Sequence, residues 1–96
     1  MTELRFEWDE RKNVANQRKH GVSFEEAQTV FFDDRALLRS DPDEAEDRFL
    51  LLGLSLALRA LVVCHCYREE DRVIRLISAR RASRSERAKY EERWKT

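Results

Sequence analysis

The sequence predicts an α+β domain, and three observations support this fold class. Residues 9–31 hold two segments with helix-start signals and helical spacing of their apolar residues. A run of apolar and β-branched segments then extends from about residue 36 to residue 79, and a last segment with a helix-start signal follows. Because the strands form one run and do not alternate with helices, we expect an antiparallel sheet of three to four strands, two N-terminal helices and a C-terminal helix.

The first helix is predicted from the residues at its two ends. Residues 4–8 could form a short edge strand before it. Asp9 is a favourable N-cap for a helix from about Glu10 to His20, and Gly21 follows where a left-handed residue commonly ends a helix. These signals bound a helix of about three turns.

The composition of this first helix is unusual. Its apolar contact with a core is expected to be small, essentially Val14 and Ala15. Lys12, Asn16 and Lys19 lie on one stripe, at spacing i, i+4 and i+7. A helix with so little apolar surface suggests a face that another chain completes.

A second helix and the strands follow. Ser23 and Glu26 match a capping box, which predicts an amphipathic helix that ends at Asp33-Asp34. We expect strands at residues 36–40, 48–58, 60–68 and 72–79. The pattern of the first of these is the weakest, so the expected number of strands is three or four. Glu69-Glu70-Asp71 fits a hairpin turn between the last two strands, although it contains no glycine.

The last helix is predicted from a second capping-box pattern. The segment Ser83-Arg84-Ser85-Glu86 begins a helix from about Arg84 to Trp94. Tyr90 and Trp94 are four residues apart and therefore share a face. We expect these two aromatic rings to dock the helix on the sheet.

Length and charge limit the classes of function. The 96 residues make one small domain, 1–96, and the equal numbers of basic and acidic residues do not by themselves suggest a nucleic-acid partner. The distribution of charge is more informative, because residues 72–96 carry nine Lys or Arg against three Glu, while residues 41–47 hold five acids. This polarity fits a protein with one basic working face, and it also fits a soluble surface of mixed sign.

The two cysteines do not predict a metal site or a disulfide. In a strand, Cys64 and Cys66 would point the same way with Cα atoms roughly 6.5–7 Å apart, at or beyond the usual disulfide span. A zinc site would need more ligands, and His65 would point to the opposite face. Without a signal peptide or an apolar run of membrane-spanning length, we expect a reduced, cytoplasmic protein that uses no metal or cofactor.

Two segments of the chain together resemble the BrnT family of toxins from bacterial type II toxin–antitoxin pairs. The first is WDERKNVANQRKHGVSFEEA, from Trp8 to Ala27, and the second is RLISARRASRSERAKY, from Arg75 to Tyr90. The resemblance implies a RelE-like microbial ribonuclease fold and an RNA-cleaving toxin that inhibits translation. It also implies a BrnA-like antitoxin with a ribbon-helix-helix DNA-binding domain, a heterotetramer of the pair, operator binding only through the antitoxin, and no membrane partner.

Metal-free RNA cleavage needs a base, an acid and cations around the phosphorane. His20 is the expected proton-transfer residue, beside Lys19, although it could instead cap the C-terminus of its helix. Arg80 and Arg81 are the candidate cations; in a continuing strand they point to opposite faces, so only one joins the site. On the same assumption Arg75 shares the face of Arg81, and we favour Arg80.

The remaining candidates would bind substrate. Lys12, Arg75 and Arg84 are expected to position phosphates, although exposed basic residues are commonly only solvated. His65 and Tyr67 share a face of their strand, so both line the site or both belong to the core. Tyr90 could stack on a base or dock the last helix.

Two other functions compete with a ribonuclease toxin. One is a degenerate toxin that binds its antitoxin and assists operon autoregulation but no longer cleaves RNA. The other is an RNA-binding protein that acts alone. Toxicity on expression without a neighbouring antitoxin gene separates the first alternative from an active toxin, and the absence of such a gene favours the second.

Overall fold

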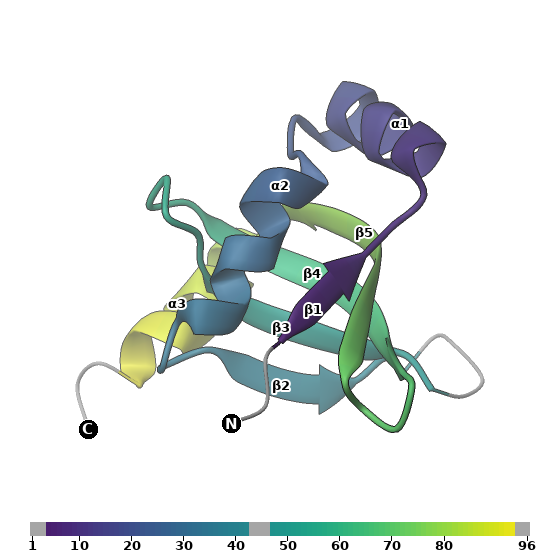
Figure 1. Ribbon diagram of the computed structural model, residues 1–96. Coiled ribbons are helices and arrows are strands. Elements are labelled where there is room, and N and C mark those ends of the chain that lie inside the picture. Colours follow the sequence, from purple (N-terminus) through teal and green to yellow (C-terminus); the bar gives the residue numbers. More distant parts are fainter. Residues whose placement is uncertain (1–3, 43–46, 94–96) are drawn as a thin grey trace.

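The computed structural model describes residues 4–42 and 47–93 (Figure 1). Residues 43–46, which belong to the predicted acidic segment, and Trp94 lie outside the described residues. The elements in chain order are β1 (Arg5–Glu7), α1 (Glu10–His20), α2 (Phe24–Ala27), the 3₁₀ helix η1 (Gln28–Phe32), β2 (Leu37–Ser40), β3 (Phe49–Leu54), β4 (Ala60–Arg68), β5 (Val73–Arg81) and α3 (Arg84–Glu92).

The α+β class is confirmed, but the sheet differs from the predicted one. It has five strands in the order β1-β5-β4-β3-β2, and β1 pairs parallel to β5 while the other pairs are antiparallel. The prediction of three or four antiparallel strands was therefore wrong. The extra edge strand is short, and its pairing with β5 is supported by an ion pair of 2.8 Å between Glu7 and Arg75.

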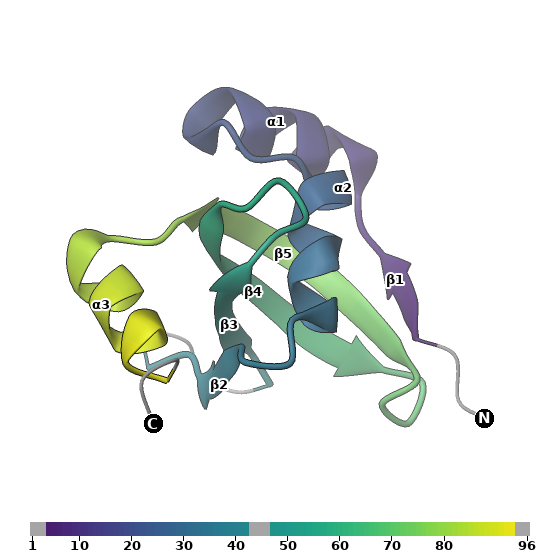
Figure 2. The ribbon, with the colours of Figure 1, turned by 90° about the vertical axis from the view of Figure 1, so that its left-hand side faces the viewer.

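The core lies between one face of the sheet and the segment α2–η1, which crosses this face (Figure 2). Its buried members come from both layers: Val22, Phe24, Ala27 and Val30 on the helical side, and Leu51, Leu61, Val63, Ile74, Leu76 and Ala79 on the sheet. The predicted second helix is only four α-helical residues long before it tightens into η1. Gly53 permits this approach, because a Cβ at that position would lie 2.9 Å from Ala36 Cβ and 3.0 Å from Val30 Cγ1.

A bulge in β5 changes which side chains share a face. Cys64 pairs with Ser78 but His65 pairs with Leu76, so Ile77 is an extra residue in β5 and the alternation reverses there. Arg75 therefore lies on the same face as Arg80, and Arg81 turns to the face that α2 and η1 cover. The prediction that Arg75 shares a face with Arg81 was wrong, because it assumed an unbroken strand.

Turns between strands also depart from the predicted boundaries. The strand expected at residues 48–58 ends at Leu54, and residues 55–59 form the turn to β4. Leu56 and Leu58 are about four-fifths exposed there, at 81% and 80%. The predicted turn Glu69-Glu70-Asp71 is confirmed, with all three residues at positive φ, a conformation that costs non-glycine residues roughly 1–2 kcal/mol each.

Helix α1 has its predicted caps but not its predicted core contact. The Asp9 side chain accepts a hydrogen bond from the Arg11 amide at 2.8 Å, and Gly21 is left-handed with φ 70°. The prediction of Val14 and Ala15 as core contacts was wrong, because both are exposed. The side of the helix that faces the protein is formed by two buried asparagines, described next.

The buried asparagines of α1 bond to backbone rather than to apolar side chains. Asn16 Nδ2 donates to the carbonyls of Val22 at 2.8 Å and Ala79 at 2.9 Å, and its Oδ1 accepts from the Ala79 amide at 3.1 Å. Asn13 Oδ1 accepts from the Phe24 amide at 2.8 Å. These bonds join α1 to the α1–α2 turn and to the end of β5, so polar pairing takes the place of apolar packing.

Helix α3 is held by few side chains. Its capping box is present, with Ser83 and Glu86 each bonding the backbone of the other. Tyr90 is buried, and its hydroxyl donates to Asp33 Oδ2 at 2.6 Å. The expectation that Tyr90 docks this helix is confirmed. No helix in the described ranges has the length and apolar character needed to cross a membrane.

Replacing Asn16 with Ala should lower the free energy of unfolding by about 2–3 kcal/mol. The change removes three hydrogen bonds and leaves the Ala79 amide buried without a partner. Urea unfolding followed by circular dichroism measures the loss. Gln17→Ala on the exposed side of the same helix is the matched control, and an equal effect of the two changes would show that the buried bonds do not stabilise α1.

Candidate functional site

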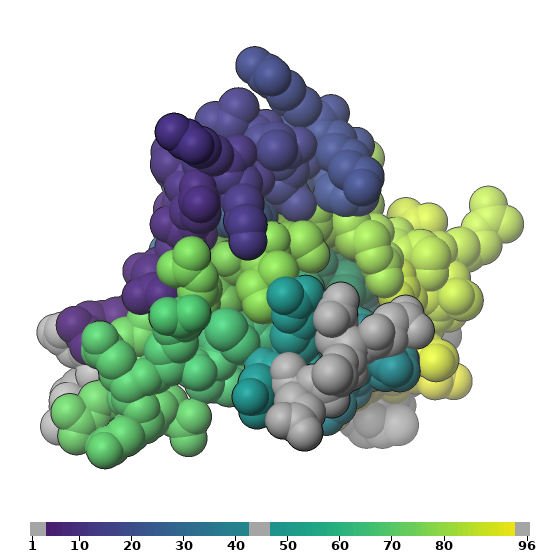
Figure 3. Space-filling view, turned by 90° about the vertical axis from the view of Figure 1, so that its right-hand side faces the viewer, coloured from purple at the N-terminus to yellow at the C-terminus, as the bar shows by residue number. Residues whose placement is uncertain are grey.

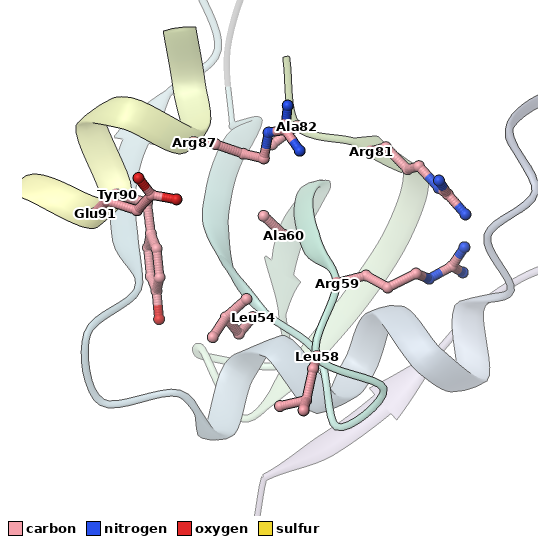
Figure 4. A pocket seen from close by; sticks show the side chains of 9 residues that line it. All are labelled: Leu54, Leu58, Arg59, Ala60, Arg81, Ala82, Arg87, Tyr90 and Glu91. Atoms are coloured by element: carbon pink, nitrogen blue, oxygen red, sulfur yellow. The ribbon is translucent and has the colours of Figure 1, made fainter. Parts of the chain in front are cut away.

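A pocket of about 430 Å³ opens where β5 leads into α3 (Figure 4). Its walls combine apolar side chains with three arginines. The lining residues are Leu54, Leu58, Arg59, Ala60, Arg81, Ala82, Arg87, Tyr90 and Glu91. This volume falls in the range of pockets that bind small ligands or parts of larger ones.

The three arginines reach the pocket from three different elements. Arg81 is the last residue of β5, Arg59 ends the turn before β4, and Arg87 lies one turn into α3. Figure 4 shows Arg59 and Arg81 on one side of the pocket, with their guanidinium groups directed the same way, and Arg87 on the other side. The bulge in β5 is the local cause of this arrangement, because it turns Arg81 toward the helix-covered face.

Glu26 fixes the position of Arg59. The guanidinium makes two hydrogen bonds to this carboxylate, one of them from Nε to Oε2 at 2.9 Å, and Ser55 Oγ donates to the same oxygen at 2.6 Å. The hydrogen bond from Arg59 lowers the pKa of Glu26 despite partial burial, and the charge of Arg81 acts in the same direction. Glu26 therefore stays ionised and offsets the repulsion between the two arginines.

Arg81 and Arg87 differ from Arg59 in their pairing. Neither has an ion-pair partner within the ranges 4–42 and 47–93. The guanidinium group of Arg81, without a carboxylate partner and next to that of Arg59, which is held in place, is suited to bind a phosphate, and Arg87 adds positive charge on the other side of the pocket. The apolar walls between them offer surface for the less polar part of a nucleotide.

The C-terminal end of α1 lies next to this pocket. Arg59 Nη2 donates to the Gly21 carbonyl at 3.0 Å, and Asn16 bonds to Ala79, two residues before Arg81. His20 immediately precedes Gly21 and is half-buried, while Lys19 is exposed. The predicted catalytic residues Lys19, His20 and Arg81 thus come from segments at the same end of the sheet, and only Arg81 of them lines the pocket.

Arg80, the favoured cation of the sequence analysis, has a different environment. Its guanidinium makes two hydrogen bonds to Glu86, at 2.7 and 3.0 Å, on the face of the sheet opposite Arg81. The bond from Arg80 lowers the pKa of Glu86 to about 2. Arg75 on the same face pairs with Glu7. These two arginines are neutralised by carboxylates, and Arg80 also links β5 to α3.

A comparison with protein families identifies the family of this chain. The model described as "Ribonuclease toxin, BrnT, of type II toxin-antitoxin system" matches residues 8–86. The chain belongs to the BrnT family. The resemblance inferred from the two sequence motifs is thereby confirmed, and the family is one of ribonuclease toxins.

A solved structure agrees with this assignment. The ribonuclease toxin BrnT of Brucella abortus, described by a crystal structure at 1.1 Å resolution, is 26% identical in sequence. The two structures superpose with a TM-score of 0.66 over 85% of this chain and 100% of that one. A comparison with curated proteins gave no match.

In this BrnT-family protein, His65 and Tyr67 lie away from the arginine pocket. The His65 side chain is fully buried at 0% exposure and contacts the ring of Phe31, with centroids 4.7 Å apart. Its Nδ1 lies 3.1 Å from the Val63 carbonyl and its Nε2 lies 3.2 Å from the Tyr67 hydroxyl. Burial lowers the pKa of His65 and raises that of Tyr67. Of the two alternatives, this geometry fits a core histidine.

The other predicted substrate-binding residues divide between pocket and surface. Tyr90 lines the pocket even though its hydroxyl is directed to Asp33. Lys12 and Arg84 are exposed outside the lining. Among the described residues no three His, Cys, Asp or Glu side chains group so as to hold a metal ion, and Cys64 and Cys66 form no disulfide there.

Sequence reasoning missed two pocket residues, Arg59 and Arg87. Arg87 lies three residues after Arg84 and three before Tyr90, so the helical stripe from the predicted cap could have identified it. It also lies beyond the family match, which ends at residue 86. Arg59 had no such signal, because its position depends on where β3 ends and on the distant partner Glu26.

Burial of His65 predicts a loss of stability in mild acid. An unfolded histidine has a pKa of about 6.5 and the folded one has a lower pKa, so the unfolded chain binds more protons below this pH. The free energy of unfolding should therefore be constant above about pH 7.5 and fall as pH drops from 7 to 5.5, by at most about 1.4 kcal/mol per pH unit. Chemical unfolding at a series of pH values measures this slope.

Two variants test which histidine causes this dependence of stability on pH. His65→Gln should remove it and lower the stability at every pH, while His20→Gln should keep it. A slope that persists in His65→Gln and disappears in His20→Gln would contradict the core assignment of His65.

Proposed function

We propose that this BrnT-family toxin cleaves RNA at the arginine pocket and thereby inhibits translation. The observation that carries the proposal is the pocket itself, where Arg81 and Arg87 make no ion pair with any described residue and line the wall with apolar side chains and Glu91. The end of α1, which carries His20, lies beside it through the bond between Arg59 and Gly21. A family of ribonuclease toxins supplies the class of reaction.

The proposed reaction needs only side chains of this chain. His20 takes the proton of the 2′-hydroxyl as the 2′-oxygen attacks phosphorus. Arg81 and Arg87 bind the non-bridging oxygens and stabilise the charge of the phosphorane. The bond from phosphorus to the 5′-oxygen then breaks, Lys19 gives a proton to the leaving oxygen, and a 2′,3′-cyclic phosphate remains. Lys12 and Arg84 position flanking phosphates, and no metal or cofactor takes part.

A degenerate toxin is the second candidate, and one observation favours it. Arg75 and Arg80, both expected in the site, are paired with Glu7 and Glu86. If RNA had to contact those two cations, the carboxylates would compete with its phosphates. In that case the protein would bind its antitoxin and contribute to autoregulation without cleaving RNA.

Arg81→Ala and His20→Ala should each abolish most RNA cleavage while the protein stays folded. Loss of a general base typically slows a reaction by about 10²–10⁴-fold. Cleavage of a labelled RNA by purified toxin measures the rate, and circular dichroism verifies the fold. Arg72→Ala, an exposed arginine outside the pocket lining, is the matched control.

Further variants and conditions test the choice of site. Arg80→Ala should mainly weaken the attachment of α3 and retain cleavage at low temperature. If Arg80→Ala is inactive but folded while Arg81→Ala cleaves normally, the site lies on the opposite face of the sheet. Cleavage should also be unchanged in a metal chelator, and loss of activity that one divalent ion restores would contradict metal independence.

We also propose that a BrnA-like antitoxin inhibits the toxin by covering this basic surface. A type II family implies a protein antitoxin. The inhibitor would bring an acidic segment to Arg59, Arg81 and Arg87, and paired ribbon-helix-helix domains would give a heterotetramer that binds operator DNA. Burial of roughly 2,000 Å² or more is typical of such permanent complexes. The wider RelE-like fold and a cytoplasmic location belong to the same proposal.

Charge reversal on the surface that the antitoxin is proposed to cover should weaken antitoxin binding more than charge reversal elsewhere. Lys19→Glu with Arg81→Glu should weaken antitoxin binding at least tenfold, because like charges then oppose each other at the interface. Asp34→Lys with Glu70→Lys changes two exposed residues by the same amount of charge elsewhere and should have little effect. Calorimetric titration with purified antitoxin gives both affinities. If the second pair of substitutions lowered the affinity more than the first pair, the antitoxin would bind another surface.

A further inference from the structure

The basic residues of this toxin differ in whether a carboxylate pairs with them. Five arginines spread over the strands and turns have carboxylate partners: Arg5, Arg59, Arg68, Arg75 and Arg80. The cations of α1 have none among the described residues, and the same is true of Arg81 and Arg87. Helix α1 therefore carries four basic residues without a carboxylate partner in one element, while the others among the described residues, Arg39, Arg72, Arg84 and Lys89, are spread over the rest of the fold.

Helix α1 presents its cations to solvent. Arg11, Lys12, Arg18 and Lys19 are all exposed, against one acidic residue, Glu10, in the same helix. Arg11 and Arg18 are seven residues apart, as are Lys12 and Lys19, so each pair lies on one side of the helix about 10 Å apart. The helix thus carries two parallel rows of positive charge.

The attachment of α1 keeps this basic side outward. Asn13 and Asn16 bind backbone groups of the α1–α2 segment and of β5. The side of the helix that carries these two residues therefore packs against the rest of the protein, and the cations face solvent. Figure 1 shows α1 extending beyond the edge of the sheet, and Figure 3 shows the same segment as a ridge above the strands. Fixed hydrogen bonds at two successive turns prevent the helix from rolling.

The basic rows end next to the arginine pocket. The C-terminal end of α1 leads to Gly21, whose carbonyl is 3.0 Å from Arg59 Nη2. A ligand that lies along Arg11 and Arg18 would therefore be directed toward Arg81. This continuity distinguishes α1 from an isolated charged surface.

We propose that α1 is a second RNA-binding element, on which Arg11 and Arg18 hold backbone phosphates of an RNA that extends beyond the pocket. The inference deepens the proposed function, on which it rests for the placement of RNA in the pocket. The toxin would then favour long RNA over short fragments. The added affinity is electrostatic and independent of base sequence, because phosphate contacts position RNA without reading it.

The exposed side of α1 fits RNA better than a lipid surface. Interfacial helices that bind membranes need a broad apolar face beside their basic one. On α1 the exposed apolar residues are Val14, at 44% exposure, and Ala15. Phosphates repeated along a flexible strand, in contrast, complement rows of cations without any apolar contact.

The double variant Arg11→Gln with Arg18→Gln tests this role. Its affinity for a 2′-O-methyl RNA of about 30 nucleotides, which cannot be cleaved, should fall roughly tenfold at low salt, and the slope of log affinity against log salt should decrease by about 1–2. Cleavage of a trinucleotide, which occupies only the pocket, should be unchanged. Arg39→Gln with Arg72→Gln removes two exposed cations elsewhere and should leave both measurements unchanged.

Each outcome separates this inference from the proposed function. If the double variant binds the long RNA as tightly as the parent, the inference is wrong, whether or not α1 then proves to bind the antitoxin. If the variant binds weakly but the parent cleaves neither the trinucleotide nor an unmodified labelled RNA, α1 binds RNA and the ribonuclease proposal fails. If the parent binds no RNA, both are wrong.

Discussion

One extra residue in β5 determines how charge is arranged on this toxin. Ile77 has no partner in the register between β4 and β5, so the alternation of side chains reverses between Leu76 and Ser78. Before the bulge Ile74 and Leu76 face the core, and after it Ala79 and Arg81 take that side. Arg80 is thereby placed with Arg75 on the other face, where both meet carboxylates. The arginine pocket exists because the bulge places Arg81, in the position that Arg80 would otherwise take, on the helix-covered face.

The end of β5 also receives α1, and polar bonding makes this contact possible. Asn16 satisfies both the amide and the carbonyl of Ala79 beyond the bulge. An apolar residue at that position would bury more carbon surface but leave backbone groups without partners. The amide side chain therefore fixes α1 at one orientation. The last turn of α1, with Lys19 and His20, lies next to the pocket as a consequence.

Carboxylates divide the basic residues of the BrnT-family chain into structural and available ones. Glu86 binds Arg80 and caps α3, while Glu26 holds Arg59 at the pocket rim. With equal numbers of acidic and basic residues, the protein has no excess of positive charge. A basic surface can still form, because carboxylates pair with five arginines of the strands and turns but with none of the four cations of α1 or with Arg81 and Arg87, among the residues that the structure describes. Net charge alone is therefore a poor guide to nucleic-acid binding here.

The sequence by itself determined the elements with local signals. The caps at Asp9, Gly21, Ser23 and Ser83 depend on residues within one turn of each other, and the family motifs are contiguous, so both could be read directly. Only the tertiary structure decided which arginine faces the pocket, since a bulge has no signature in the alternation of RLISARR. It also decided that α1 is held by Asn13 and Asn16, and that Arg59 joins the site, because their partners lie far along the chain. Hydrogen bonds between residues close in the chain can be predicted from the sequence, whereas strand register and long-range pairing arise only when the strands and helices pack.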